Sequence, residues 1–208
     1  MSLQHTIQNA TQILVDHVDE LTELDQAIGD GDHGLNMKRG AQAIQAKLPE
    51  MQDTSLNDAL KTMGKTCVAI IGGSSGPVFG TVLMTLGKEL PDNPSALDFA
   101  PALRSSIEAL TRLGKAQVGQ KTLLDVLDPV QKVLALGGDD LLARVKQCAF
   151  DSSLATADMD ATRGRSSFLG DRAKGHIDPG SRSMALIIGS VCDSLSMSQS
   201  APTPNNRS

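Results

Sequence analysis

The stretch CVAIIGGSSGPVFGTVLMTLGKEL, residues 67–90, decides between an all-helical fold and one that contains a sheet. Its segments VAII and VFGTVL could each form a short buried strand. However, Val82, Leu86 and Leu90 recur at four-residue steps, which is the spacing of one helical face. No other segment offers partner strands for a sheet. We therefore predict a helix, a Gly/Ser loop and a second helix, within an all-α fold.

Amphipathic patterns continue on both sides of this stretch. Upstream, apolar residues at three- and four-residue steps predict helices over 7–28 and 35–48, and a third helix that begins after Ser55. Ser55 and Asp58 have the spacing of a capping box. Downstream, the patterns predict helices over about 98–113, 123–136, 139–161 and 179–195, with Asp178 as the last N-cap. The chain is expected to form about eight helices.

Length and composition indicate one globular domain. The chain has 208 residues, of which 40% are hydrophobic and 21% are charged, and this is enough for one sizeable core. We expect the domain to span 1–195 and to be followed by a polar, disordered tail over 196–208. The sequence has no run of eighteen apolar residues and no signal-peptide pattern, so we expect a cytoplasmic protein without a membrane span. Three widely spaced cysteines favour free thiols over a disulfide framework.

The charge distribution points to cations rather than to nucleic acid as a partner. The net charge is −5, and no basic stripe is available to displace counterions from nucleic-acid phosphates. The first Lys or Arg is Lys38, whereas seven carboxylates precede it between Asp16 and Asp32. Those carboxylates therefore have no cation within their own segment to offset them.

Three of these carboxylates are spaced so that they can converge. In LDQAIGDGDHGLNM, residues 24–37, Asp25 lies near the end of a helix, and Asp30 and Asp32 lie in the following turn. A helix that ends at Gly29 can fold that turn back over its last residues. Close like charges are costly unless a cation lies between them, and carboxylate oxygens suit Mg²⁺ or Ca²⁺. The alternative is an acidic helix end with a capping turn, although negative charge there opposes the helix dipole.

The ligand pattern excludes an EF-hand and favours Mg²⁺ with phosphate. Counted from Asp30, the fifth, sixth and twelfth loop residues are Gly34, Leu35 and Ala41, which do not match an EF-hand. Mg²⁺ is commonly held by a few carboxylates and completed by phosphate oxygens. The same turn opens the next helix, where four backbone N–H groups could bind a phosphate, those of His33, Gly34, Leu35 and Asn36. By itself, His33 is as compatible with a capping or solvated role.

Two further loops could contact an anion. The loop GGSSGPVFGT, residues 72–81, places Gly and Ser before a helix, although such residues are common in any tight turn. The segment GRSSFLGDRAKGHIDPGSRS, residues 164–183, carries cationic or titratable side chains that could shield phosphate charge, namely Arg165, Arg172, Lys174 and His176. A solvated surface loop is the simpler alternative for that segment.

The segment GKAQVGQKT, residues 114–122, resembles a P-loop but does not match one. Gly114 and Gly119 have the right separation, but Gln120 intervenes before Lys121, and the preceding residues are helical rather than a strand. A nucleotide bound to this chain must therefore be held by another architecture.

Taken in order, these motifs resemble those of the nucleotide-binding L subunit of dihydroxyacetone kinase. The matching stretches are LDQAIGDGDHGLNM, GGSSGPVFGT, GQKTLLDVLDP, GRSSFLG and GHIDPG, and they cover most of the chain from Leu24 to Gly180. The resemblance implies an antiparallel eight-helix barrel with ADP or ATP at one end, bound through two Mg²⁺ ions. Gln120 departs from the acidic residue expected in the family pattern.

The resemblance also implies roles for individual residues. The metal ligands would be Asp25, Asp30 and Asp32. The nucleotide would be surrounded by His33, Gly34, Leu35, Asn36, Ser74, Ser75, Gly114, Thr122, Leu123, Arg165, Asp178, Pro179 and Gly180. Arg165 would also be available to stabilise charge during transfer, and no protein nucleophile would be required.

The family implies partners as well. In the phosphotransferase-linked members, ADP stays bound, receives a phosphoryl group from a phosphohistidine on an M subunit, and passes it to dihydroxyacetone on the K subunit. An alternative is the nucleotide subunit of an ATP-dependent kinase for dihydroxyacetone, another short ketose or a fatty acid. A third is a non-catalytic metal-binding module, for instance a partner of a transcription regulator. The donor, the acceptor and the oligomeric state, including a homodimer, stay open.

Overall fold

Nine α-helices account for most of the computed structural model, which describes residues 2–199 apart from the side chains of Arg165 and Gln199. They are α1 (Leu3–Asp16), α2 (Val18–Ile28), α3 (His33–Ala46), α4 (Leu56–Ile70), α5 (Ser75–Glu89), α6 (Phe99–Gly114), α7 (Leu124–Leu136), α8 (Leu141–Ala155) and α9 (Pro179–Gln199). Four short 3₁₀ segments join them, η1 (Leu48–Met51), η2 (Ala96–Asp98), η3 (Thr156–Asp158) and η4 (Arg165–Ala173). Residues 2–199 contain no strand, so the predicted all-α fold is confirmed.

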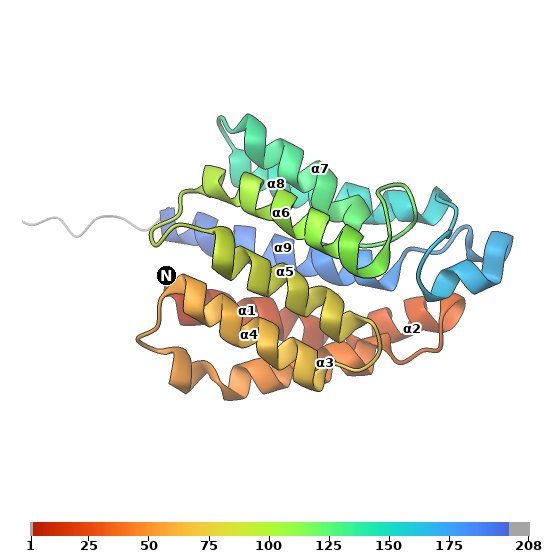
Figure 1. Ribbon diagram of the computed structural model, residues 1–208, viewed down its shortest axis with the longest axis horizontal. Helices are drawn as coiled ribbons and strands as arrows, with labels where there is room; N and C mark the ends of the chain where they lie inside the picture. The colour runs from red at the N-terminus through yellow and green to blue at the C-terminus, as the bar shows by residue number, and fades with distance from the viewer. Residues whose placement is uncertain (1, 200–208) are drawn as a thin grey trace, which may run out of the picture.

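The helices form a closed ring. From α3 to α9, each helix packs against the next one in the chain, and α9 returns to pack against α1, which in turn packs against α3. The helices run side by side along the long axis of the molecule (Figure 1). Helices α1 and α2 follow one another directly and occupy one position in the ring. The ring therefore has eight positions, which agrees with the predicted eight-helix barrel.

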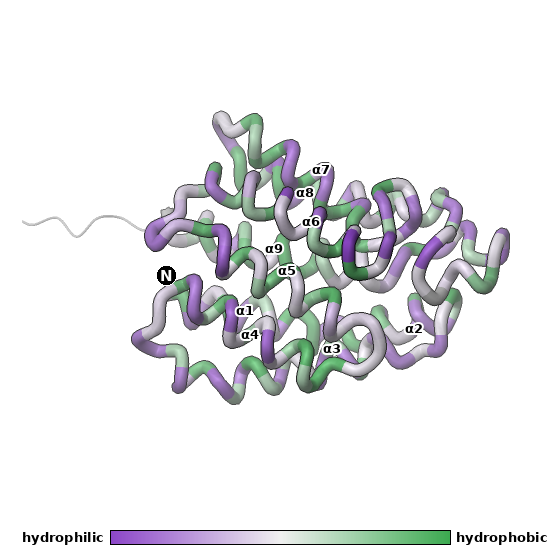
Figure 2. Tube along the Cα trace, in the orientation of Figure 1, coloured by the Kyte–Doolittle hydropathy of each residue, from purple (hydrophilic) through white to green (hydrophobic). Residues whose placement is uncertain are grey.

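The core is filled by aliphatic side chains and methionines. Leu21, Met37, Val126, Leu127 and Val130 are almost completely buried, and they belong to one continuous apolar cluster. Hydrophobic and hydrophilic residues are interspersed along the helices at the front of the view (Figure 2). Each helix therefore buries one stripe in the barrel and exposes the other, as its periodicity predicts.

Two predicted helix caps are present. The Ser55 hydroxyl accepts a hydrogen bond from the Asp58 N–H at 3.1 Å and opens α4. The Asp178 carboxylate accepts one from the Ser181 N–H at 2.7 Å and opens α9. Each cap satisfies an N–H group that has no partner within its helix.

Three predicted boundaries are wrong. The helix predicted over 7–28 breaks at His17, where the backbone leaves helical geometry with φ −106° and ψ 20°. The Ile13 carbonyl oxygen accepts both the His17 N–H and, at 2.8 Å, the His17 Nδ1–H. The helix predicted over 139–161 begins at Leu141 and ends at Ala155, where the chain tightens into η3. The last helix continues to Gln199, so 196–199 extend α9, and residues 200–208 of the predicted tail lie outside the described residues.

The helices are too short or too polar to cross a bilayer. Within the described residues, none combines the length and the hydropathy that a membrane span requires.

Candidate functional site

A cavity of about 410 Å³ opens at one end of the barrel. Its walls come from five places: the α2–α3 turn, the Gly/Ser loop before α5, the end of α6, the loop before α7, and the segments on either side of η4 that lead into α9. These connections all lie at the right-hand end of the molecule in Figure 1. The cavity is therefore built mainly from loops and helix ends, while the helices hold those loops in place.

The three predicted carboxylates converge in this cavity. One oxygen from each of Asp25, Asp30 and Asp32 can be chosen so that all lie within 4.8 Å of one another. Asp25 is buried, whereas Asp30 is exposed. At Gly29, a Cβ atom would lie 2.1 Å from Oδ1 of Asp25, so only glycine lets the turn pass this closely over the end of α2. This carboxylate-only donor set suits a hard divalent cation such as Mg²⁺.

His33 is buried directly beside the carboxylates. Its N–H donates to Asp25 Oδ2 at 3.1 Å, and its ring nitrogens lie 3.1 Å from Ser75 Oγ and 2.8 Å from Ser183 Oγ. Burial lowers the pKa of the imidazole to about 4, although the Asp25 carboxylate acts in the opposite direction. His33 is therefore neutral at pH 7 and links α3 to the starts of α5 and α9.

The loop before α7 is held by a buried carboxylate. Asp125 accepts hydrogen bonds from the Gly119 N–H and, at 2.7 Å, from the Thr122 N–H. Only 2% of Asp125 is exposed. The carboxylate therefore fixes the backbone that presents Thr122 and Leu123 to the cavity.

Lys121, the lysine of the near-miss P-loop, holds the backbone of the cavity wall. Its side chain is fully buried, and Nζ donates to three carbonyl oxygens, those of Thr156, Ala157 and His176. Burial lowers the pKa of this amine, while the Asp178 carboxylate opposes the shift. An ammonium has three N–H donors. All three are used by the backbone, so Lys121 has none left for a phosphate.

Asp178 combines the N-cap of α9 with a position on the cavity wall. Burial raises the pKa of its carboxyl to about 7. The Ser181 N–H and Lys121 oppose this shift, and the carboxylates of Asp125 and Asp25 add to it. Asp178 is therefore partly protonated near neutral pH.

Most residues that the sequence assigned to a nucleotide line this one cavity. The structure brings together the three aspartates with His33, Ser74, Ser75, Gly114, Thr122, Leu123, Asp178, Pro179 and Gly180. Three assigned residues are not on the described lining. Gly34 packs against Val18 and Thr22, Leu35 is 57% exposed, and Asn36 is buried against Gly72. Their nucleotide contacts stay a prediction.

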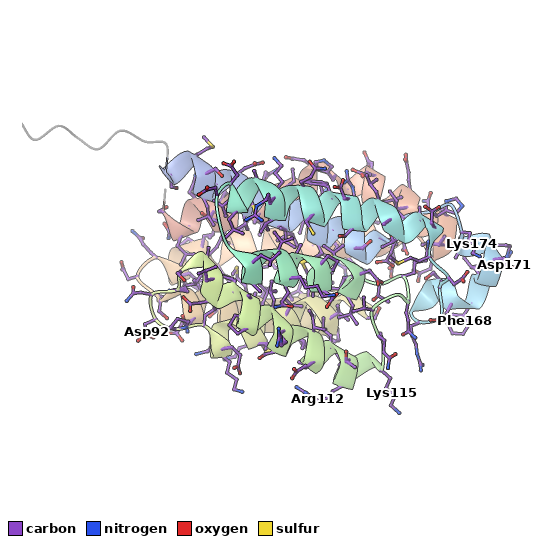
Figure 3. The ribbon with its side chains drawn as sticks, turned by 90° about the horizontal axis from the view of Figure 1, so that it is seen from above. Asp92, Arg112, Lys115, Phe168, Asp171 and Lys174 are labelled. Carbon is purple, nitrogen blue, oxygen red and sulfur yellow. The ribbon has the colours of Figure 1, made fainter. Side chains whose placement is uncertain are left out.

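The basic loop reaches the cavity through a residue that the sequence did not single out. Arg163 lines the cavity, whereas Arg172, Lys174 and His176 are absent from the described lining. Lys174 instead pairs with Asp160 at 2.8 Å, and it lies with Phe168 and Asp171 at the outer tip of the molecule (Figure 3). Arg165 begins η4, and its side chain lies outside the described residues. The sequence signal for Arg163 was its position just before the GRSSFLG motif.

Comparison with known proteins identifies the family. Residues 27–193 match the model of the DAK2 domain. This chain belongs to the DAK2 domain family. A similar DAK2 relative is the Listeria innocua protein named PEP-dependent dihydroxyacetone kinase 1, ADP-binding subunit DhaL, which is 40% identical over 80% of this chain and 82% of the relative. The Escherichia coli ADP-binding subunit DhaL is 36% identical over 81% of this chain and 84% of the relative.

Solved structures show the same DAK2 fold. The dihydroxyacetone kinase from C. freundii, solved in complex with AMP-PNP and Mg²⁺, matches with a TM-score of 0.75 at 23% identity. The match covers 92% of this chain and 33% of that larger one. At this level of identity, the likeness shows the fold and leaves individual site residues to the geometry described above.

Proposed function

We propose that this chain is the nucleotide-binding subunit of a dihydroxyacetone kinase. Mg²⁺-bound ADP would accept a phosphoryl group from a phosphohistidine on an M subunit and pass it to dihydroxyacetone held by a K subunit. The observation that carries this proposal is the convergence of Asp25, Asp30 and Asp32 in a cavity that is also lined by the Gly/Ser loop and the first residues of four helices. The names of the Listeria and Escherichia relatives point the same way.

The cavity has the polarity that a nucleoside diphosphate needs. Leu110, Leu113, Leu123 and Leu124 contribute an apolar wall, which suits a flat base. The carboxylates of the α2–α3 turn and the Gly/Ser loop also line the cavity, and backbone N–H groups and divalent ions there would meet phosphate oxygens. We propose that the leucines contact the nucleoside and that the aspartates and the Gly/Ser loop face the phosphates.

The carboxylates fit Mg²⁺, and we propose that they hold two ions. Bound Mg²⁺ would neutralise phosphate charge, which is the main requirement of phosphoryl transfer through a loose transition state. The residues of this chain shape the site that would hold the ions. Gly29 lets the turn close over Asp25, neutral His33 holds Ser75 in place, and Asp125 and Lys121 fix the backbone opposite.

The sugar and the donor belong to partner proteins in this proposal. The kinase of known structure is about three times as long as the part that this chain matches, which is consistent with a separate K subunit for the sugar. We place this machinery in the cytoplasm. A homodimer and a transcription regulator as partner stay predictions.

The test is retention of ADP and Mg²⁺ by Asp30→Asn. We expect the wild-type chain, purified gently without added nucleotide, to carry ADP and Mg²⁺ in native mass spectrometry. The variant should lose both while its helical circular dichroism is unchanged, because Asp30 is exposed and an amide is a weaker Mg²⁺ ligand. Asp53→Asn, an exposed change in the loop before α4, is the matched control and should retain both.

Experiments with partner proteins distinguish the carrier function from that of an ATP-dependent kinase subunit. Labelled phosphate should move from the phosphorylated M subunit onto ADP bound to the wild-type chain. A chain that releases ADP and exchanges it for ATP between turnovers would instead be the subunit of an ATP-dependent kinase. A chain that binds neither nucleotide nor Mg²⁺ would contradict the proposed function.

A further inference from the structure

Two basic residues, Lys121 and Arg163, lie on the described lining of the cavity. The ammonium of Lys121 is used by three backbone carbonyls, and neutral His33 contributes no positive charge. Arg163 is exposed, and its guanidinium has no ion-pair partner among the described side chains. Among the described residues, Arg163 is thus the cation available to meet an anion in the cavity.

The segment that carries Arg163 is anchored beside the aspartates. Ala161 is buried in a small apolar cluster with Ile28 and Ala173. Ile28 is the last residue of α2 and lies two positions before Asp30. The cluster therefore joins the segment before Arg163 to the end of α2, next to the turn that carries Asp30.

The neck of the η4 loop is closed by two polar contacts. The Gly175 N–H donates to the Ala157 carbonyl at 2.9 Å, and Lys174 pairs with Asp160 at 2.8 Å. Both contacts join the segment that precedes η4 to the segment that follows it. They close the base of the loop that contains Arg163, and Arg163 itself lines the cavity.

We propose that Arg163 binds the terminal phosphoryl group of ATP and thereby distinguishes ATP from ADP. This inference rests on the proposed function. In the proposed orientation, with the base at the leucines, the phosphate farthest from the base lies toward the aspartates, and the segment before Arg163 is joined to α2 beside them. A guanidinium offers a planar pair of donors that matches phosphate oxygens. ATP carries one more phosphate than ADP, so a cation at this position would raise the affinity for ATP more than the affinity for ADP.

Isothermal titration calorimetry in excess Mg²⁺ tests this assignment, with ADP and a non-hydrolysable β,γ-imido analogue of ATP as probes. Arg163→Gln should weaken binding of the analogue by at least about tenfold and change ADP binding by less than about twofold. Arg163→Lys should recover part of the lost affinity, since lysine keeps the positive charge but lacks the planar pair of donors. Arg172→Gln, an exposed arginine of the same loop away from the lining, is the matched control and should bind both probes as the wild type does.

Other outcomes would overturn the assignment. An equal loss of affinity for both nucleotides would place Arg163 on an inner phosphate or on the nucleoside. Unchanged affinity for both would show that it touches neither. If the wild-type chain bound neither nucleotide, the proposed function itself would fail, which is a distinct result. Circular dichroism of each variant checks that the helices are intact.

Discussion

At the scale of single residues, His33 and Asp178 are the two side chains at the site whose pKa values are most displaced, and they are displaced in opposite directions. His33 has a pKa of about 4 in the folded chain against 6.5 when unfolded. As pH falls through this window the unfolded state takes up a proton first, so stability falls. Asp178 has a pKa of about 7 against 3.8. As pH rises through that window the unfolded state loses its proton first, so stability also falls. The two contributions oppose one another between pH 4 and 6.5.

Asp178→Asn should separate the pH-dependent stability contribution of Asp178 from that of His33. The amide oxygen can still accept the Ser181 N–H that caps α9, but it cannot ionise. Relative to the wild type, the variant should gain about 2 kcal/mol in unfolding free energy between pH 4.5 and 7.5. We take less than the full value of about 1.4 kcal/mol per pKa unit because the cavity is open to water. Urea titrations in excess chelator at three pH values measure this, and a difference that is independent of pH would mean that Asp178 is already ionised in the folded chain.

The aspartate convergence was predictable from sequence, whereas the supporting residues were not. A helix end at Gly29 and the spacing of Asp25, Asp30 and Asp32 were enough to bring three carboxylates together. Lys121 was visible only as a misplaced P-loop lysine, because its three carbonyl partners lie 35 to 55 residues further along the chain. The segment before Arg163 is joined to α2 through the apolar cluster of Ile28, Ala161 and Ala173, and such a long-range association leaves no local pattern.

At the scale of elements, the helices follow their local signals closely. The caps at Ser55 and Asp178 and the Gly/Ser break before α5 all lie where the sequence placed them. The break at His17 was missed because the apolar period continues across it, and the change lies in the backbone angles of this one residue. The short turns of η4 were also missed, since their residues have no helical period. Periodicity thus predicts which face is buried better than it predicts where a helix bends.

Lys121 joins three connecting segments, and its removal should loosen all of them. Lys121→Met deletes the donor to the carbonyls of Thr156, Ala157 and His176. Leaving buried carbonyls without a donor is expected to cost about 2–4 kcal/mol of unfolding free energy. Chemical denaturation followed by circular dichroism measures this cost.

The matched control for that change is Lys115→Met. Lys115 also has a left-handed backbone, with φ of 51° against 61° for Lys121, but its side chain is exposed. The control should lose less than about 0.5 kcal/mol. Equal stability of the two variants would show that the buried amine contributes nothing net.

At the scale of the whole molecule, the cavity draws its walls from segments spread between residues 25 and 180. A ligand that fills it would therefore bind only to the closed barrel and not to the unfolded chain. With ADP at about one hundred times its dissociation constant in excess Mg²⁺, stability should rise by about 2.7 kcal/mol, or roughly 5–10 °C in Tm. Differential scanning calorimetry measures the shift. It should vanish when EDTA replaces Mg²⁺, and an equal shift in EDTA would mean that the carboxylates do not hold the nucleotide through metal.

The ring closes where the first helix meets the last. The α1–α9 seam includes a hydrogen bond from Asn9 Nδ2 to Ser194 Oγ at 3.1 Å, and Glu20 of α2 pairs with Arg182 of α9 at 2.6 Å. During translation, the face of α1 that packs on α9 therefore stays uncovered until residues 179–199 have been made, although α1 can pack on α3 earlier. Chaperones that bind exposed apolar surface would act longest on this face of α1.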